Sequence, residues 1–188
     1  RQYEKELISL YEEFKHTYPN SPYLAAMQGY YEEICAFHAP KNLSDDIQFM
    51  TDTEDISTME ALLSRFAGKK VYIDVWATWC GPCKDEFAHE GVLHGLLEDK
   101  GYEMLYLSID KDRDDSQWRE MVAYYKLRGY HARAGKALIF DLQRLFDADG
   151  AMSIPWNMIV DTQGHIVQLH APRPSDTEAL SAALDSVK

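Results

Sequence analysis

The chain has 188 residues, of which 46% are hydrophobic, and its formal net charge at pH 7 is −12. This length suits one domain plus an extension, and the composition is normal for a protein with a folded core. The strong negative charge argues against nucleic acid or an anionic membrane surface as a partner.

The three cysteines are too few for a fold held together by disulfides, so we interpret Cys80 and Cys83 as a pair and Cys35 as a single thiol. No run approaches the roughly 18 apolar residues of a membrane span, and no signal peptide is visible. Because the sequence begins at Arg1 and not at Met, we expect that an upstream segment carried the targeting information.

Residues 1–40 are predicted to form a helical hairpin. Over 2–18 the apolar residues recur at helical spacing, at Tyr3, Leu7, Leu10, Tyr11, Phe14 and Tyr18. Prolines break the chain, and 23–37 then repeats the pattern with Leu24, Met27, Tyr30, Tyr31, Ile34 and Phe37. The short connection favours two antiparallel helices, which pack on the main domain or end a preceding one. Cys35 is expected to be a small buried residue, with a redox or intermolecular thiol as the alternative.

Residues 41–188 are predicted to form the main domain, in which strands alternate with helices. In chain order, we expect a short edge strand at 47–50, a helix at 58–66, a buried strand at 70–76, a helix at 81–98 and a strand at 102–109. The capping-box pattern from Ser57 to Glu60 marks the start of the first helix. A strand, a helix and a second strand in this order imply a right-handed crossover and a parallel pair.

The rest of the domain is predicted to continue in the same way. We expect a helix at 115–126, a helix at 136–147, a hairpin of strands at 156–160 and 165–170, and a C-terminal helix to about 187. A strand at 137–140 is the alternative to the second helix, and Asp149-Gly150 is expected to form a turn. A second capping box, from Ser175 to Glu178, opens the last helix.

The paired cysteines lie where the buried strand meets a helix. The strand is rich in β-branched and aromatic residues: Val71, Ile73, Val75 and Trp76. Pro82 fits the first turn of the helix, because its missing N–H would have no partner there. The helix dipole and unpaired backbone N–H groups favour a thiolate, so the pKa of Cys80 should fall from about 8.5 toward about 7 or lower. Cys83 lies one turn further on, close enough to resolve a mixed disulfide.

Two cysteines separated by two residues also occur in haem and zinc sites. Haem attachment needs a His directly after the second cysteine, where this chain has Lys84. Zinc needs two further ligands, and His89 and His94 would lie about 140° apart on their helix. We therefore expect dithiol redox chemistry and no metal.

The sequence resembles thioredoxin-fold proteins, at the active-site segment Trp79-Cys80-Gly81-Pro82-Cys83, at Ile73-Asp74-Val75-Trp76-Ala77 before it, and at Ile154-Pro155 with its following hairpin. The long insert makes it more similar to the TlpA/ResA type of thiol-disulfide oxidoreductase. The resemblance covers roughly residues 42–188. It implies an α/β thioredoxin fold, with a central mixed sheet flanked by helices, and a variable loop at 128–135.

The resemblance also implies roles for site residues. Cys80, first on its helix and nearest to solvent, is expected to attack a substrate disulfide, and Cys83 to release the product. Asp74 matches the buried carboxylate beneath the dithiol of thioredoxin and would accept the proton of Cys83, with a solvent-facing Asp as the alternative. Thioredoxin's partner lysine maps near Tyr106, so the Tyr106 hydroxyl is the candidate partner of Asp74.

Substrate binding is expected on both sides of the dithiol. The resemblance implies a cis Ile154-Pro155 bond, which keeps the backbone of Ile154 beside Cys80 to bind an extended peptide. Trp79 is expected to cover one side of the site, with ordinary packing as the alternative. Gly81 and Pro82 form the dipeptide of thioredoxins, which are reductants near −270 mV, so we expect a reductase. For Asn157, His131 and His165 we expect solvated loop or hairpin positions, with a place in the site as the alternative.

The predicted function is that of an exported reductase of protein disulfides, in the bacterial periplasm or at the outer cell surface, anchored through a segment outside this chain. Its electrons would come from a membrane or soluble thiol donor, and it would need no cofactor beyond the Cys80–Cys83 disulfide. An oxidase or isomerase, a cytoplasmic reductase, and a scaffold whose N-terminal helices dock a partner are the alternatives.

Overall fold

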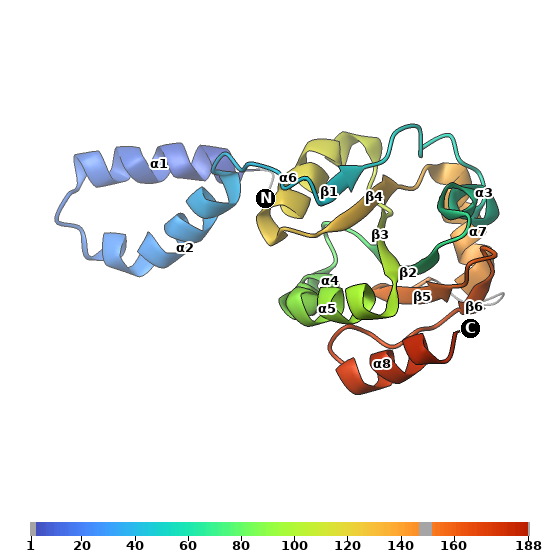
Figure 1. Ribbon diagram of the computed structural model, residues 1–188. Coiled ribbons are helices and arrows are strands. Elements are labelled where there is room, and N and C mark those ends of the chain that lie inside the picture. Colours follow the sequence, from blue (N-terminus) through green and yellow to red (C-terminus); the bar gives the residue numbers. More distant parts are fainter. Residues whose placement is uncertain (1–2, 147–151, 188) are drawn as a thin grey trace. The chain divides into compact units, whose positions relative to one another are not determined.

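The computed structural model describes residues 3–146 and 152–187, and the chain divides into two compact units, residues 1–42 and 43–188 (Figure 1). The first unit contains α1 (Glu4–Thr17) and α2 (Pro22–His38), which confirms both predicted helices. Ser21 caps α2, and its hydroxyl accepts the N–H of Tyr23.

The two helices of the first unit contact each other through aromatic side chains. Tyr11 stacks on Tyr31, with 4.1 Å between the ring centroids. The predicted stripes are only partly buried, since these apolar residues are more than 40% exposed: Tyr3, Leu7, Leu10, Tyr18, Met27 and Tyr30. A hairpin of two helices can cover only one side of each helix. Cys35 carries a free thiol and is partly exposed, so it is less buried than expected.

The second unit is built on a six-stranded mixed sheet in the order β1-β4-β3-β2-β5-β6. The strands are β1 (Ile47–Phe49), β2 (Lys70–Trp76), β3 (Tyr102–Ser108), β4 (Gly129–Arg133), β5 (Trp156–Val160) and β6 (Ile166–Gln168). Strands β1, β4, β3 and β2 run parallel, and β5 and β6 are antiparallel to their neighbours. The predicted edge strand, parallel pair and hairpin are therefore confirmed.

Helices flank this sheet on both sides, as expected for the α/β thioredoxin fold (Figure 1). They are α3 (Met59–Leu63) with η1 (Ser64–Phe66), α4 (Gly81–Glu86), η2 (Phe87–His89), α5 (Glu90–Lys100), η3 (Asp112–Asp114), α6 (Asp115–Tyr125), α7 (Lys136–Phe146) and α8 (Thr177–Asp185). The helix α7 confirms the prediction for 136–147 against the alternative strand. The expected turn at Asp149-Gly150 lies outside the described residues. Within the described residues, none of the helices has both the length and the apolar character needed to span a bilayer.

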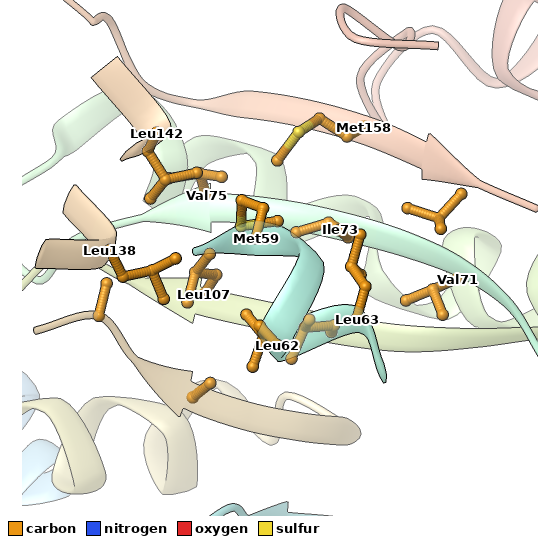
Figure 2. Close-up of a cluster of buried hydrophobic side chains, with 14 of the residues drawn as sticks. Met59, Leu62, Leu63, Val71, Ile73, Val75, Leu107, Leu138, Leu142 and Met158 are labelled. Carbon is orange, nitrogen blue, oxygen red and sulfur yellow. The ribbon is translucent and has the colours of Figure 1, made fainter. Parts of the chain in front are cut away.

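The main hydrophobic core lies on the face of the sheet that α3 and α7 cover. Side chains of β2 and β3 meet those of the two helices there: Val71, Ile73, Val75, Leu107, Met59, Leu62, Leu63, Leu138 and Leu142 (Figure 2). Because side chains alternate along a strand, the intervening residues Tyr72, Asp74 and Trp76 point to the opposite face. That face carries the polar residues of the site described below.

Most of the segment 128–135 is strand β4 (Gly129–Arg133), so the expected variable loop is wrong here. Strand β4 pairs with β1 on one side and with β3 on the other, and this pairing satisfies its backbone. Gly129 begins it with φ +128, and a Cβ there would lie 2.7 Å from the carbonyl oxygen of Met104. Only glycine suits this close approach.

The predicted helix at 81–98 is interrupted. A tight 3-10 turn at Phe87–His89 separates α4 from α5. This turn lets Phe87 pack edge-on against Trp76, with ring centroids 5.2 Å apart, while Glu90 reaches the hydroxyl of Tyr106. Tertiary packing here outweighs the helical pattern.

The two capping boxes are each shifted by one residue. The caps are Thr58, which accepts the N–H of Ala61 at 3.2 Å, and Asp176, which accepts that of Ala179 at 3.2 Å. Ser175 instead donates to Glu86, the last residue of α4.

Candidate active site

Cys80 and Cys83 form a disulfide at the junction of β2 and α4. Cys80 is the N-cap residue of α4, and its Sγ accepts the backbone N–H of Cys83 at 3.1 Å. Pro82 occupies the first turn of the helix, as predicted. Cys80 is 4% exposed and Cys83 is fully buried, so Cys80 is the cysteine nearer to solvent. A sulfur in this position receives a hydrogen bond and the positive end of the helix dipole.

The segment before Cys80 is held by a buried carboxylate at the end of β3. Asp110 accepts the backbone N–H of Thr78 at 2.9 Å and the Thr78 hydroxyl at 2.8 Å. It also accepts the hydroxyl of Ser108 at 2.8 Å. These bonds fix the turn that leads from β2 into the cysteine pair.

Asp74 is buried in the centre of the sheet at 2% exposure, which rules out the solvent-facing alternative. Its pKa is raised to about 8, first by burial and then by the negative charges of Glu90 and Glu86. An interaction with Asn157 and the charge of Arg173 act in the opposite direction. Asp74 can therefore hold or release a proton near neutral pH.

The expected partnership between Asp74 and the Tyr106 hydroxyl is wrong. Tyr106 is the register neighbour of Asp74 on β3, but its hydroxyl donates to Oε1 of Glu90. The reason is the 3-10 turn, which brings Glu90 over β3. Burial and the negative charge of Glu90 raise the pKa of Tyr106 well above 10, so the hydroxyl remains a donor.

The Ile154-Pro155 peptide bond is cis, as the resemblance implies. It directly precedes β5, whose first residue, Trp156, pairs with Val75 near the end of β2. The cis bond thus lies at the same end of the sheet as Cys80. Pro155 is buried, and Ile154 is partly exposed.

Trp79, Gly81 and Pro82 are exposed around the dithiol. Trp79 is 65% exposed, so ordinary packing into the core does not account for it. Both residues between the cysteines also face solvent.

Two expectations about nearby polar residues are wrong, and one is confirmed. Asn157 and His131 are buried at 2% and 0% exposure, respectively, because both lie on sheet strands. Burial lowers the pKa of His131 to about 4, so it is neutral at pH 7. The side chain of His165 is 76% exposed, as predicted for a hairpin position.

Sequence reasoning missed Glu86 and Glu90, the two buried or partly buried carboxylates of the active-site helices. Glu86 accepts the N–H and the hydroxyl of Ser175, both at 2.9 Å. Glu90 binds Tyr106 and lies 3.0 Å from His94. The available signal was the four-residue spacing from Glu86 through Glu90 to His94, which predicts one helix face.

No group of His, Cys, Asp or Glu in residues 3–146 and 152–187 is arranged to hold a metal ion. The site instead combines a pair of sulfurs with a buried carboxylate, Asp74, on the strand that leads to them. What this arrangement can do chemically is exchange a disulfide and store the accompanying proton.

Comparison with known proteins gives matches over the same region. Residues 50–185 match the family model described as Redoxin. Curated relatives include the thiol-disulfide oxidoreductase ResA of Bacillus thuringiensis subsp. konkukian, which is 25% identical over 114 residues covering 61% of each chain. ResA of Bacillus subtilis is 24% identical over 116 residues, covering 62% of this chain and 60% of the relative. The chain thus spans about three fifths of the length of these relatives.

Solved structures with the same fold include two from Bacteroides vulgatus and Chlorobium tepidum. A candidate thiol-disulfide oxidoreductase from Bacteroides vulgatus is 31% identical, with a TM-score of 0.54 over 67% of this chain and 83% of that chain. A candidate thiol:disulfide interchange protein DsbE from Chlorobium tepidum is 29% identical, with a TM-score of 0.51 over 65% and 84%. Because the Redoxin model matches well over half of its residues, this chain belongs to the Redoxin family, as a thioredoxin-fold protein of the ResA/TlpA type.

Proposed function

We propose that this protein is a thiol-disulfide oxidoreductase and that it reduces protein disulfides through Cys80 and Cys83. The observation that carries the proposal is the position of Cys80, which caps α4 while its Sγ accepts the N–H of Cys83. A thiolate formed there is stabilised by the helix, and a resolving sulfur is already within bonding distance.

The proposed reaction proceeds by two exchanges. The Cys80 thiolate attacks one sulfur of the substrate disulfide, and the other substrate sulfur leaves as a thiolate. Cys83 then gives its proton to Asp74 and attacks the Cys80 sulfur, which releases the second substrate thiolate and forms the Cys80–Cys83 disulfide. Two electrons have then passed from the dithiol to the substrate. A thiol donor regenerates the dithiol by the same exchange.

Asp74 is proposed to manage the proton in both directions. With a pKa of about 8, it is mostly protonated at pH 7 and can protonate Cys83 as that sulfur leaves during regeneration. In the reducing step it must be ionised, so that step should accelerate as the pH rises toward about 8. A group whose pKa lies near the working pH serves both roles.

The rim of the site is proposed to bind an extended peptide. The backbone of Ile154, next to the cis Pro155, supplies strand-like hydrogen bonds, and the exposed ring of Trp79 supplies apolar contact. Gly81 and Pro82 add little side-chain bulk to this rim, and they set the reduction potential of the Cys80–Cys83 pair. No cofactor beyond the Cys80–Cys83 disulfide is required by this scheme.

The proposed setting is the bacterial periplasm or the outer cell surface, with anchoring through a segment outside this chain and electrons from a membrane or soluble thiol donor. The support for it is family-level: the chain is similar to ResA proteins and to a candidate DsbE. The acidic surface disfavours nucleic acid as a partner.

The test is reduction of insulin disulfides with dithiothreitol as donor. We expect turnover by the wild type and its loss in Cys80→Ser, because the attacking thiolate is gone. Cys83→Ser should trap a mixed disulfide through Cys80, visible on a non-reducing gel. Cys35→Ser is the matched control and should retain full activity, since Cys35 lies in the other unit.

An absence of turnover by folded, reduced wild type would contradict the proposal and favour the scaffold. The direction is tested separately, by the equilibrium of the Cys80–Cys83 couple with glutathione. A potential near that of thioredoxin supports a reductase, whereas one nearer to −120 mV would identify an oxidase.

A further inference from the structure

A row of polar residues crosses the sheet beneath the active-site helix. His131 on β4, Tyr106 on β3, Asp74 on β2 and Asn157 on β5 are successive register partners. All four are at most 2% exposed, and the rings of Tyr106 and His131 stack with 5.0 Å between centroids. Since register partners project to the same face of a sheet, the four side chains form one continuous line. It lies opposite the apolar core of Figure 2.

Glu90 on α5 binds this row from above. It accepts the Tyr106 hydroxyl through Oε1, and its Oε2 lies 3.0 Å from Nε2 of His94. Its side chain is 15% exposed, and that of His94 is 8% exposed. Glu90 is also the first residue of α5, where the helix dipole favours a negative charge.

The two carboxylates of this region are treated differently by their surroundings. Oε1 of Glu90 accepts the Tyr106 hydroxyl, and Glu90 begins α5, where the helix dipole suits a carboxylate. Within the described residues, Oδ1 of Asp74 has no hydrogen-bond partner, and the same is true of Oε2 of Glu90. A negative charge near a buried carboxylate disfavours ionisation of that carboxylate, so Glu90 favours the protonated form of Asp74.

We propose that Glu90 is a positioning residue for the thiol-disulfide reaction: its carboxylate, placed over the row by the Tyr106 hydroxyl, keeps the proton on Asp74. This inference rests on the proposed function and deepens it. Glu90 touches neither cysteine in any recorded contact and acts only through Asp74. The raised pKa of Asp74, in which Glu90 is the largest cause after burial, agrees with this geometry.

Other titratable and charged groups also enter the electrostatic balance around Asp74. Glu86 on α4 and Arg173 before α8 act on its pKa, and Tyr72 and Tyr106 interact with its charge. His131 on β4 stacks on Tyr106, and His94 on α5 lies beside Glu90. His131 is neutral at pH 7, and both oxygens of Glu86 bind Ser175, so a substitution at Glu86 would also break the contact between α4 and the segment before α8. Glu90 is therefore the group to alter.

The test follows the carboxyl carbon of Asp74 by NMR through a pH titration of the oxidised protein. In Glu90→Gln, which keeps size and removes charge, the titration midpoint of Asp74 should fall by about one pH unit. Glu98→Gln is the matched control on the same helix, where the side chain is 69% exposed, and should leave the midpoint unchanged. Glu90→Asp should restore most of the wild-type value, because it restores the charge.

An Asp74 midpoint that is the same in wild type and Glu90→Gln would overturn the inference. Should Glu90→Gln fail to fold, Tyr106→Phe supplies the test. Loss of the hydroxyl donor removes the bond that holds the Glu90 carboxylate over the row, so the midpoint should move down by a smaller amount, and no movement would again refute the role.

The outcome is separate from that of the proposed function, since the titration needs no turnover. In the insulin assay, Glu90→Gln should shift the pH profile of kcat to lower pH with KM unchanged, because Glu90 does not contact the substrate. A wild type without turnover would refute the function, while the titration would still decide the role of Glu90.

Discussion

At the scale of single residues, the chemistry depends on two groups with unusual surroundings. Cys80 was found from sequence because a helix start, a proline and a second cysteine lie within four residues. Asp74 was found through the resemblance alone, since an aspartate at the end of an apolar run is equally compatible with solvent. Glu90 was missed, because its partner Tyr106 is 16 residues away and contacts it only through the fold.

Asp74→Asn should change both rate and stability. The resolving step should slow by about 10²-fold, because a neutral amide cannot accept the Cys83 proton. The folded protein keeps the Asp74 proton up to about pH 8, whereas the unfolded chain loses it near 3.8, so the wild type loses stability as pH rises between these values. At pH 8 the variant should therefore be more stable than the wild type, by at most about 5 kcal/mol. At pH 3 this advantage should be absent.

Urea unfolding at the two pH values measures this difference. Asp99→Asn on exposed surface is the control and should show equal stability changes at both. Equal stability of wild type and Asp74→Asn at pH 8 would contradict the assigned proton affinity of Asp74.

At the scale of elements, local patterns predicted most helices and strands, since apolar residues recur at periods that match them. The strand β4 was not predicted because its residues His131 and Arg133 are polar. Both are buried, and their partners are distant in sequence: the side chain of Arg133 lies 2.7 Å from Glu54 and 2.6 Å from Asp112. Hydrophobic periodicity cannot reveal that a buried polar side chain has partners far away in the sequence. The 3-10 turn after α4 also depends on such distant contacts, so periodicity did not predict it.

Gly129→Ala should destabilise the main domain. The new methyl group would approach the carbonyl oxygen of Met104 to 2.7 Å, at a backbone angle that favours glycine, so we expect a loss of about 1–3 kcal/mol. Gly95→Ala on α5 is the matched control, because nothing lies within 4 Å of the added methyl group. It should stabilise the helix by up to about 1 kcal/mol. Chemical denaturation measures the unfolding free energy of both variants. Equal changes in Gly129→Ala and Gly95→Ala would contradict this interpretation.

At the scale of the whole molecule, the fold class was predictable because the order of strands and helices restricts the topology to few choices. The division into two units agrees with the break after two short helices, although their predicted apolar stripes proved largely exposed. Stability against pH is also a property of the whole chain, and two buried groups act on it with opposite signs.

His131 should make the protein sensitive to acid. Its pKa is about 4 in the fold and 6.5 when unfolded, so stability falls as the pH drops through this window, where only the unfolded chain gains a proton. His131→Gln should reduce that acid-dependent loss by up to about 3 kcal/mol, measured as the change in unfolding free energy between pH 7 and 4. The control His165→Gln, at an exposed site, should leave the slope as in wild type.

The contrast between the two tryptophans near the dithiol has a practical consequence. Trp76 is sealed inside the sheet, while Trp79, adjacent to Cys80, has 65% of its surface in water. Indole emission moves to shorter wavelength when water is excluded. A peptide bound over Trp79 should therefore produce a blue shift against the constant emission of the buried Trp76, Trp118 and Trp156. The native chain therefore contains its own optical reporter of substrate docking, with no attached dye.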